Sequence, residues 1–262
     1  LDAVLDVIRV LGGGLHGPGL VLSTACSSSA RVFASAQRLL ACGVCDAVLV
    51  GGVDSLCGLT VRGFAGLEVL SHAPCRPFSR ERAGINIGEG AALLLLERHG
   101  DGPARLLGVG DSSDAYHMTS PHPEGLGARL AMERALAAAG LSPADVDHVN
   151  AHGTGTRQND SMESAAIRAV FGAPESGAGV PVVATKGYTG HMLGAAGATE
   201  VAFVIDAIAG GYLPAGVGAD PVDDSLGVDV VTARRERRTR AALSNSFAFG
   251  GSNVSVLIGA PA

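Results

Sequence analysis

The chain is poor in aromatic and charged residues. Its 262 residues include no tryptophan, 3 tyrosines and 7 phenylalanines, and only 17% of them are charged. Hydrophobic residues make up 47%, and the mean hydropathy is +0.32. These values exclude the polar, highly charged composition of an intrinsically disordered chain. The length fits one large or two modest domains with a buried core.

Positive charge is scarce and is carried almost entirely by arginine. The 19 basic residues are outnumbered by 25 acidic ones, and all but Lys186 are arginine. Binding to nucleic acid requires a broad cationic surface, so we expect no nucleic-acid partner. A chain this biased toward arginine suggests that its single amine is kept for a chemical reason.

Long apolar runs and a basic leader are also absent. The longest uninterrupted apolar run, residues 91–96, is far too short to span a membrane. The first residues carry acids early, which does not match a secretory signal. We therefore expect a cytoplasmic protein that does not bind membranes.

Cysteine is present in an odd number without regular pairing, which fits a reducing compartment better than a disulfide framework. Cys42 and Cys45 form a C-x-x-C pair, but no second pair and no nearby histidine completes a zinc site. We interpret them as small core residues at a helix end and expect no metal site.

The hydrophobic pattern predicts an α/β protein. Residues 19–24 read as a strand, a polar turn follows, residues 32–40 have helical spacing up to Gly43, and residues 46–52 read as a buried strand. The same reasoning predicts strands over 85–97, 104–111, 147–150, 180–185, 241–246 and 254–258, and helices over 126–139, 160–170 and 193–209. Strands that alternate with helices are typical of α/β folds.

Cys26 follows the first predicted strand directly and opens a helix. The free amides and the dipole of a helix N-terminus favour a thiolate and lower the thiol pKa, so this position predicts a nucleophile. The alternative is an inert, buried cysteine, which is common for this residue type.

Two histidines lie in glycine-rich turns at strand ends. His152 is in AHGTGT, where Thr154 and Thr156 offer hydroxyls that could bind an amide-bearing arm such as pantetheine. His191 lies five residues after Lys186. Either histidine alone is more often structural, but both together with Cys26 indicate a catalytic site.

These motifs resemble those of the β-ketoacyl synthases, the elongating condensing enzymes of fatty acid and polyketide synthesis. The resemblance rests on TACSSSA around Cys26, AHGTGT around His152, ATKGYTGHMLGAAGA around Lys186 and His191, and SNSFAFGGSN near the C-terminus. It is collinear over nearly the whole chain, and the linking segments look like those of free-standing, type II enzymes. It implies a thiolase-like, layered α-β-α-β-α fold.

The resemblance implies a role for each motif residue. Cys26 accepts an acyl chain as a thioester, and His152 and His191 assist decarboxylation of malonyl carrier protein and stabilise the enolate. The backbone amides of Cys26 and Phe249 form the oxyanion hole. Decarboxylative Claisen condensation then gives a β-ketoacyl carrier protein.

The remaining site residues follow from the same resemblance. Lys186 is expected to pair with Glu163, because a buried ammonium needs a carboxylate partner. Phe247 and Phe249 match the aromatics of the gating loop, although two phenylalanines before a glycine turn could also be core residues. No bound cofactor is implied; the phosphopantetheine arm of the acyl carrier protein arrives with the substrate.

The resemblance also divides the chain and predicts its partners. Residues 1–99 match the C-terminal part of the first synthase half, and residues 100–262 match the second half. Roughly the first third of a family chain has no counterpart here, so we expect an exposed sheet edge, apolar faces, and association or poor folding in isolation. The expected partners are the acyl carrier protein and a second synthase chain, in a homodimer or heterodimer. The arginine-rich run at 234–240 is either a carrier-protein contact or a solvated surface run.

Other functions stay open on the sequence. A non-catalytic thiolase-fold partner or truncated relic is favoured by the missing first third and opposed by Cys26 and the two histidines. A thiolase or starter-type condensing enzyme shares the fold, but starter-type enzymes typically use asparagine where this chain has His191. A cysteine hydrolase lacks any matching pattern.

Overall fold

The computed structural model describes residues 17–176 and 179–261; the N-terminal segment on which the expectation of a missing leader rests lies outside them. The main sheet has six strands in the order β3-β10-β9-β4-β5-β7. Its strands are β3 (Arg105–Ser113), β4 (His148–Asn150), β5 (Pro181–Val183), β7 (Asp229–Val230), β9 (Ala241–Ala248) and β10 (Ser252–Gly259). β10 runs antiparallel to both its neighbours, whereas β9, β4, β5 and β7 are parallel.

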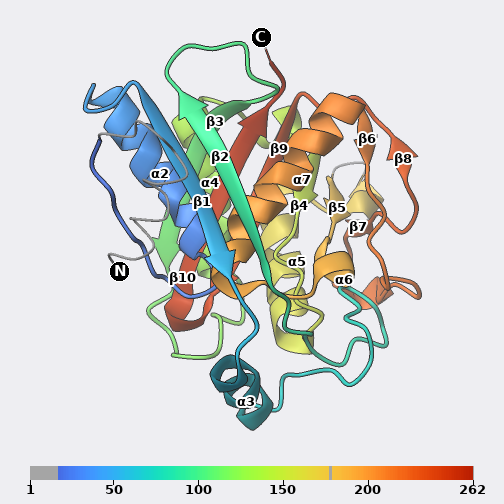
Figure 1. The fold of residues 1–262 in the computed structure, drawn as a ribbon. Coiled ribbons are helices and arrows are strands. Elements are labelled where there is room, and N and C mark those ends of the chain that lie inside the picture. Colours follow the sequence, from blue (N-terminus) through green and yellow to red (C-terminus); the bar gives the residue numbers. More distant parts are fainter. Residues whose placement is uncertain (1–16, 177–178, 262) are drawn as a thin grey trace.

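Helices cover both faces of this sheet (Figure 1). One face carries α4 (Leu126–Ala139) and α5 (Arg157–Phe171), whose apolar residues form the larger core with the strands. The other face carries α2 (Ser28–Ala41) and α7 (Ala196–Gly210), and a second, two-stranded sheet packs on them. This gives the order helix, sheet, helix, sheet, which is the expected thiolase-like α/β layering without its outermost helical layer among the described residues.

The second sheet pairs β1 (Ala47–Asp54) with β2 (Gly90–Glu97) in antiparallel register. Because side chains alternate along a strand, Val50 and Leu94 point inward to α2 and α7. Val53, Leu93 and Leu95 point outward, and each is more than half exposed. Figure 1 shows the outer face of this strand pair uncovered.

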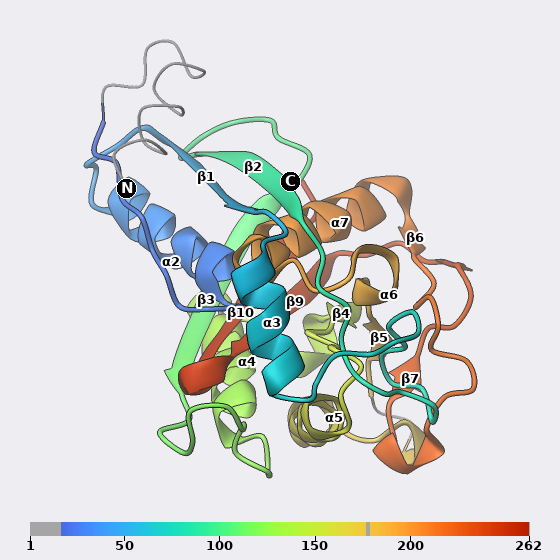
Figure 2. The same cartoon turned by 60° about the horizontal axis from the view of Figure 1, so that its bottom comes forward.

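The remaining elements are short. They are α3 (Gly58–Gly66), α6 (Lys186–Thr189), β6 (Tyr212–Leu213) and β8 (Arg235–Glu236). In Figure 2 α3 comes to the front, and none of its residues is buried.

Most predicted elements form, with two corrections. The predicted strand over 19–24 is wrong, because no neighbouring strand pairs with it in the described part of the chain; its one bridge joins Thr24 to Cys26. The predicted strand over 85–97 is shorter, since regular pairing with β1 begins at Gly90. Cys42 is exposed at the end of α2, so its interpretation as a core residue is also wrong.

Within the described residues, the helical stretch Leu193–Gly210 is long and apolar enough to cross a membrane by length and composition. Half of it is buried inside the protein. Its apolar residues Val201, Val204 and Ile208 pack in the core between the two sheets. The hydropathy of this stretch therefore follows from its place as a central helix.

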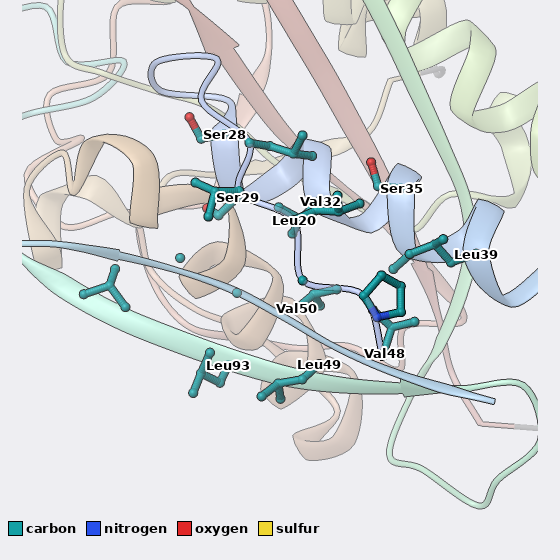
Figure 3. A pocket seen from close by; sticks show the side chains of 18 of the residues that line it. Leu20, Ser28, Ser29, Val32, Ser35, Leu39, Val48, Leu49, Val50 and Leu93 are labelled. Carbon is teal, nitrogen blue, oxygen red and sulfur yellow. The ribbon is translucent and has the colours of Figure 1, made fainter. Parts of the chain in front are cut away.

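An apolar groove opens beside the second sheet (Figure 3). It has a volume of about 580 Å³ and lies between residues 17–23, α2 and β1. Figure 3 shows Val32 and Leu39 of α2 on one side and Val48 and Val50 of β1 on the other. In the described chain β1 is hydrogen-bonded to a strand only along its β2 edge. The groove and the outer face of β1 and β2 are the exposed apolar surfaces that the sequence predicts.

We expect this chain, by itself, to sediment as a dimer or larger species. Replacing both Leu93 and Leu95 with lysine should shift it toward the monomer, because charges on a free sheet oppose sheet-to-sheet association. Met118→Lys is the control, since Met118 is equally apolar and 79% exposed but lies away from the sheet. Analytical ultracentrifugation over a range of concentrations measures the result. A wild-type chain that stays monomeric at every concentration contradicts the prediction.

Candidate active site

Cys26 lies in a tight turn between the extended residues 17–23 and α2. Ala25, just before it, has a φ of 52°, a left-handed conformation that is rare for a residue with a side chain. The turn is closed by the Ser28 amide, which donates to the Ala25 carbonyl, and by the Thr24 amide, which donates to Ser28 Oγ. Backbone strain of this kind persists only where the surroundings impose it, and here it fixes the direction of the Cys26 side chain.

Cys26 faces a cavity of about 100 Å³ between the two halves of the fold. All the predicted site residues line it except Lys186 and Glu163, which are fully buried behind its wall. The lining residues among them are Cys26, His152, Thr154, Thr156, His191, Phe247 and Phe249. The tertiary fold therefore brings together residues that are more than 200 positions apart in sequence.

The two histidines are held as neutral hydrogen-bond donors. Their rings meet edge to face with centroids 5.2 Å apart. Lys186 Nζ lies 3.3 Å from His152 Nδ1, and the Leu193 amide donates to His191 Nδ1. Since Nδ1 accepts in both rings, the proton of each neutral ring is on Nε2. Burial, reinforced by the Lys186 charge, lowers the pKa of both histidines well below its usual value.

The partner of Lys186 is Glu200 of α7, not Glu163. The Lys186 ammonium donates to Glu200 Oε1 at 2.5 Å and to the His152 carbonyl at 2.5 Å. Both side chains of this ion pair are 1% exposed. The ammonium is therefore paired and hydrogen-bonded, as a buried charge requires.

Glu163 instead supports the loop that carries His152. Its oxygens accept hydrogen bonds from the amides of His152 and Gly153, both at 2.8 Å, and from Asn245 Nδ2 at 3.2 Å. Burial raises the pKa of Glu163 to about 7. The predicted Lys186–Glu163 pair is wrong because α5 directs this carboxylate at backbone amides, which use its oxygens.

The expected lowering of the Cys26 thiol pKa is also wrong for this enclosed site. Burial raises the pKa of Cys26 to about 11, although the Lys186 charge and the amides of Cys26 and Phe249 lower it. The two amides donate to the Cys26 sulfur, so they converge on the position where the predicted oxyanion would form. Desolvation of the thiolate outweighs these favourable interactions.

The gating phenylalanines lie on opposite sides of the cavity mouth. Phe247 is buried, with its ring centroid 6.0 Å from that of His152. Phe249 opens the turn after β9 and stacks on Phe64 of α3, with ring centroids 5.8 Å apart. Phe64 also lines the cavity, so α3 contributes to the mouth.

The two threonines are hydrogen-bonded to each other, with their Oγ1 atoms 2.9 Å apart. Thr156 also caps α5 by accepting from the Asn159 amide. Both hydroxyls remain on the cavity wall, as the binding of a pantetheine amide would require, and this role stays a prediction.

Sequence reasoning missed Glu200 and Phe64. Glu200 had a signal, because it is the only carboxylate in the apolar first half of the predicted helix over 193–209. Phe64 had none, since its segment has no clear pattern. The arginine-rich run contributes no residue to the cavity lining; its arginines Arg234, Arg235, Arg237 and Arg240 form ion pairs at the surface.

The raised pKa makes a prediction for Cys26 reactivity. Alkylation by iodoacetamide should accelerate about tenfold for each pH unit between pH 7 and pH 9.5, because only the thiolate reacts. Cys57 is an internal control, since it is exposed and its hydrogen bond to Thr60 lowers its thiol pKa. Its rate should level off within the same range. Peptide mass spectrometry at each pH measures both rates, and a plateau for Cys26 below pH 9 contradicts the prediction.

The layered fold and the cavity with one cysteine and two histidines define a protein of the thiolase-like class. Two family models match consecutive parts of the chain: the β-ketoacyl synthase N-terminal domain at residues 11–102 and the β-ketoacyl synthase C-terminal domain at residues 103–220. The chain belongs to the β-ketoacyl synthase family.

Individual relatives agree with this assignment. The mitochondrial 3-oxoacyl-[acyl-carrier-protein] synthase of Arabidopsis thaliana is 38% identical over 262 residues, which cover 93% of this chain and 57% of the relative. The ketosynthase ApeO from Xenorhabdus doucetiae, solved in complex with its chain length factor ApeC, is 45% identical with a TM-score of 0.91, over 99% of this chain and 64% of that one. A ketosynthase solved with its type II polyketide acyl carrier protein is 30% identical with a TM-score of 0.92, over 99% of this chain and 66% of that one. The chain thus spans about three fifths of the length of these relatives.

Proposed function

We propose that this chain carries the condensing site of a β-ketoacyl carrier-protein synthase in fatty acid or polyketide synthesis. The observation that carries the proposal is the convergence on one cavity of the Cys26 sulfur, two amides that donate to it, and two neutral histidines. This arrangement provides a nucleophile, an oxyanion hole and two further donors for a developing negative charge.

In the first half-reaction, Cys26 Sγ attacks the carbonyl carbon of an acyl thioester. The carbonyl oxygen becomes negative and is stabilised by the amides of Cys26 and Phe249. The bond to the carrier thiol then breaks, and the leaving thiolate takes up the proton released by Cys26. The acyl chain is now a thioester of Cys26.

In the second half-reaction, a malonyl thioester enters beside the histidines. Its carboxylate leaves as carbon dioxide, and the electron pair of the broken bond forms an enolate. The Nε2 protons of His152 and His191 stabilise the enolate oxygen. The enolate carbon attacks the acyl carbonyl, the bond to Cys26 breaks, and the Cys26 thiolate regains a proton. The product is a β-ketoacyl thioester of the carrier.

The proposal includes two partners. An acyl carrier protein would deliver both substrates on its phosphopantetheine arm, which Thr154 and Thr156 are placed to bind. A second synthase chain would cover the exposed apolar surfaces, in a homodimer or in a heterodimer with a related chain. The ketosynthase solved with a chain length factor and the one solved with a carrier protein support these partners. The reaction would take place in the cytoplasm, without a bound cofactor.

The proposal is tested by intact-protein mass spectrometry after incubation with an acyl carrier-protein thioester. The wild-type chain should gain the mass of one acyl group, and the Cys26→Ala variant should gain none. Cys75→Ala is the matched control, because Cys75 is also buried and its pKa is also raised, but it lies outside the cavity lining. A folded wild-type chain that forms no adduct would indicate a non-catalytic partner subunit.

A further inference from the structure

The oxyanion hole is assembled from two segments that are far apart in the sequence. One amide belongs to Cys26, just before α2, and the other to Phe249, in the turn between β9 and β10. Such donors act only when they lie about 2.7–3.1 Å from the oxygen that they stabilise. The spacing between the two segments therefore has to be fixed by contacts outside the cavity.

The chain has a polar link at this junction. Ser27 follows Cys26, is fully buried, and donates to Ser252 Oγ at 3.1 Å. Ser252 is the first residue of β10, directly after the turn that carries Phe249. The two hydroxyls thus connect the residue after the nucleophile to the residue after the Phe249 turn.

Arg31 holds this link from one turn further along α2. Its Nη2 donates to Ser252 Oγ at 2.9 Å, and its Nη1 donates to Asp111 Oδ2 of β3, also at 2.9 Å. A guanidinium is planar and presents its donors in a fixed fork, so binding Asp111 with one nitrogen orients the other toward Ser252. Asp111 lies on the strand that pairs with β10. The link therefore ties α2, β3 and β10 together at one point.

We propose that Arg31 and Ser252 are positioning residues that set the spacing between the Cys26 and Phe249 amides. The inference rests on the proposed function, since only acyl transfer places negative charge on an oxygen between these amides. Neither residue touches the substrate. Their effect is confined to reactions that use both amides.

Two reactions of Cys26 separate this role from a structural one. Acyl transfer from a thioester of N-acetylcysteamine develops an oxyanion, whereas alkylation by iodoacetamide uses the same sulfur without one. In Arg31→Met and Ser252→Ala, acyl transfer should fall by about tenfold to hundredfold, while alkylation should change by less than about threefold. Ser252→Thr retains the hydroxyl and should restore acyl transfer to within about twofold of wild type.

Arg38→Met is the matched control. Arg38 lies on the same helix, and its Nη2 is 4.0 Å from the same Asp111 oxygen, but its side chain is 70% exposed and has no contact with Ser252. This variant should transfer acyl groups at the wild-type rate. A parallel loss of both reactions in Arg31→Met and Ser252→Ala overturns the proposal, as does unchanged acyl transfer.

The test also separates this inference from the proposed function. A wild-type chain that is alkylated but never acylated contradicts the proposed function, and the positioning role with it. Acylation of the wild type and of both variants at equal rates contradicts the positioning role alone.

Discussion

Replacing Lys186 with methionine should lower the free energy of unfolding by about 3–5 kcal/mol, because it leaves the buried Glu200 carboxylate without its partner. Glu200 Oε2 already has no hydrogen-bond partner. Burial raises the pKa of Glu200, and Lys186 is the main group that lowers it. Without Lys186 this pKa rises further, so Glu200 can escape the penalty by binding a proton. The loss in the variant should therefore be smaller at low pH and grow as the pH rises.

The double variant Lys186→Met, Glu200→Leu distinguishes stability from chemistry. It removes both charges together, so it should recover most of the stability lost in the single variant. It should still transfer acyl groups to Cys26 slowly, since the cation that lowers the pKa of Cys26 is gone. Thermal unfolding followed by circular dichroism measures the first effect and adduct formation the second.

The control for this experiment is a surface ion pair. Arg80 and Asp224 are 2.8 Å apart, and their side chains are 63% and 86% exposed. Arg80→Met should change stability by less than about 1 kcal/mol. A change of similar size in Lys186→Met would show that the buried pair does not hold the site together.

Replacing Glu163 with alanine should cost about 3 kcal/mol or more, because it leaves three buried N–H donors without acceptors. The donors are the amides of His152 and Gly153 and the side chain of Asn245. Acyl transfer should also fall, since the loop that carries His152 loses its anchor. Glu133→Ala is the control, because the Glu133 side chain is 47% exposed on α4. Urea denaturation measures the difference, and equal stability of the two variants contradicts the prediction.

The pH dependence of stability provides a separate test of Glu163. Its folded pKa is about 7, above the ordinary value of 4.5. Between these values the folded state holds a proton that the unfolded state has lost, so this group loses stability as the pH rises through the window. The total is about 3 kcal/mol, since each pKa unit corresponds to about 1.4 kcal/mol. Glu163→Gln does not titrate, so the stability of the wild type relative to this variant should decline from pH 4.5 to pH 7.5. A constant difference over this range contradicts the raised pKa.

The order of elements and the identity of the cavity residues could be predicted from the sequence. The helix over 126–139 forms with the predicted bounds, because its pattern and the following Gly140 are local signals. Cys26, His152 and His191 could be found because each lies in a turn at the start or end of a regular element. Parallel strands and the helices after them bring such turns to one edge of a sheet, so local position already implied proximity.

Other predictions failed where the outcome depended on distant residues. The segment over 19–24 has the composition of a strand, but a strand requires a hydrogen-bonded neighbour, and the described chain offers none. The position of Cys26 at a helix N-terminus predicted a lowered pKa, but its depth of burial, which no local pattern encodes, raised it instead.

The sequence by itself therefore determined the α/β class, the family motifs and the need of Lys186 for a carboxylate partner. Only the tertiary structure decided that this partner is Glu200, that Glu163 holds the His152 loop, and that Phe64 closes on Phe249. The physical reason is the same in each case. Propensity and turn chemistry act over a few residues, whereas the pairing of a buried charge depends on which oxygen reaches it first when separate helices pack together.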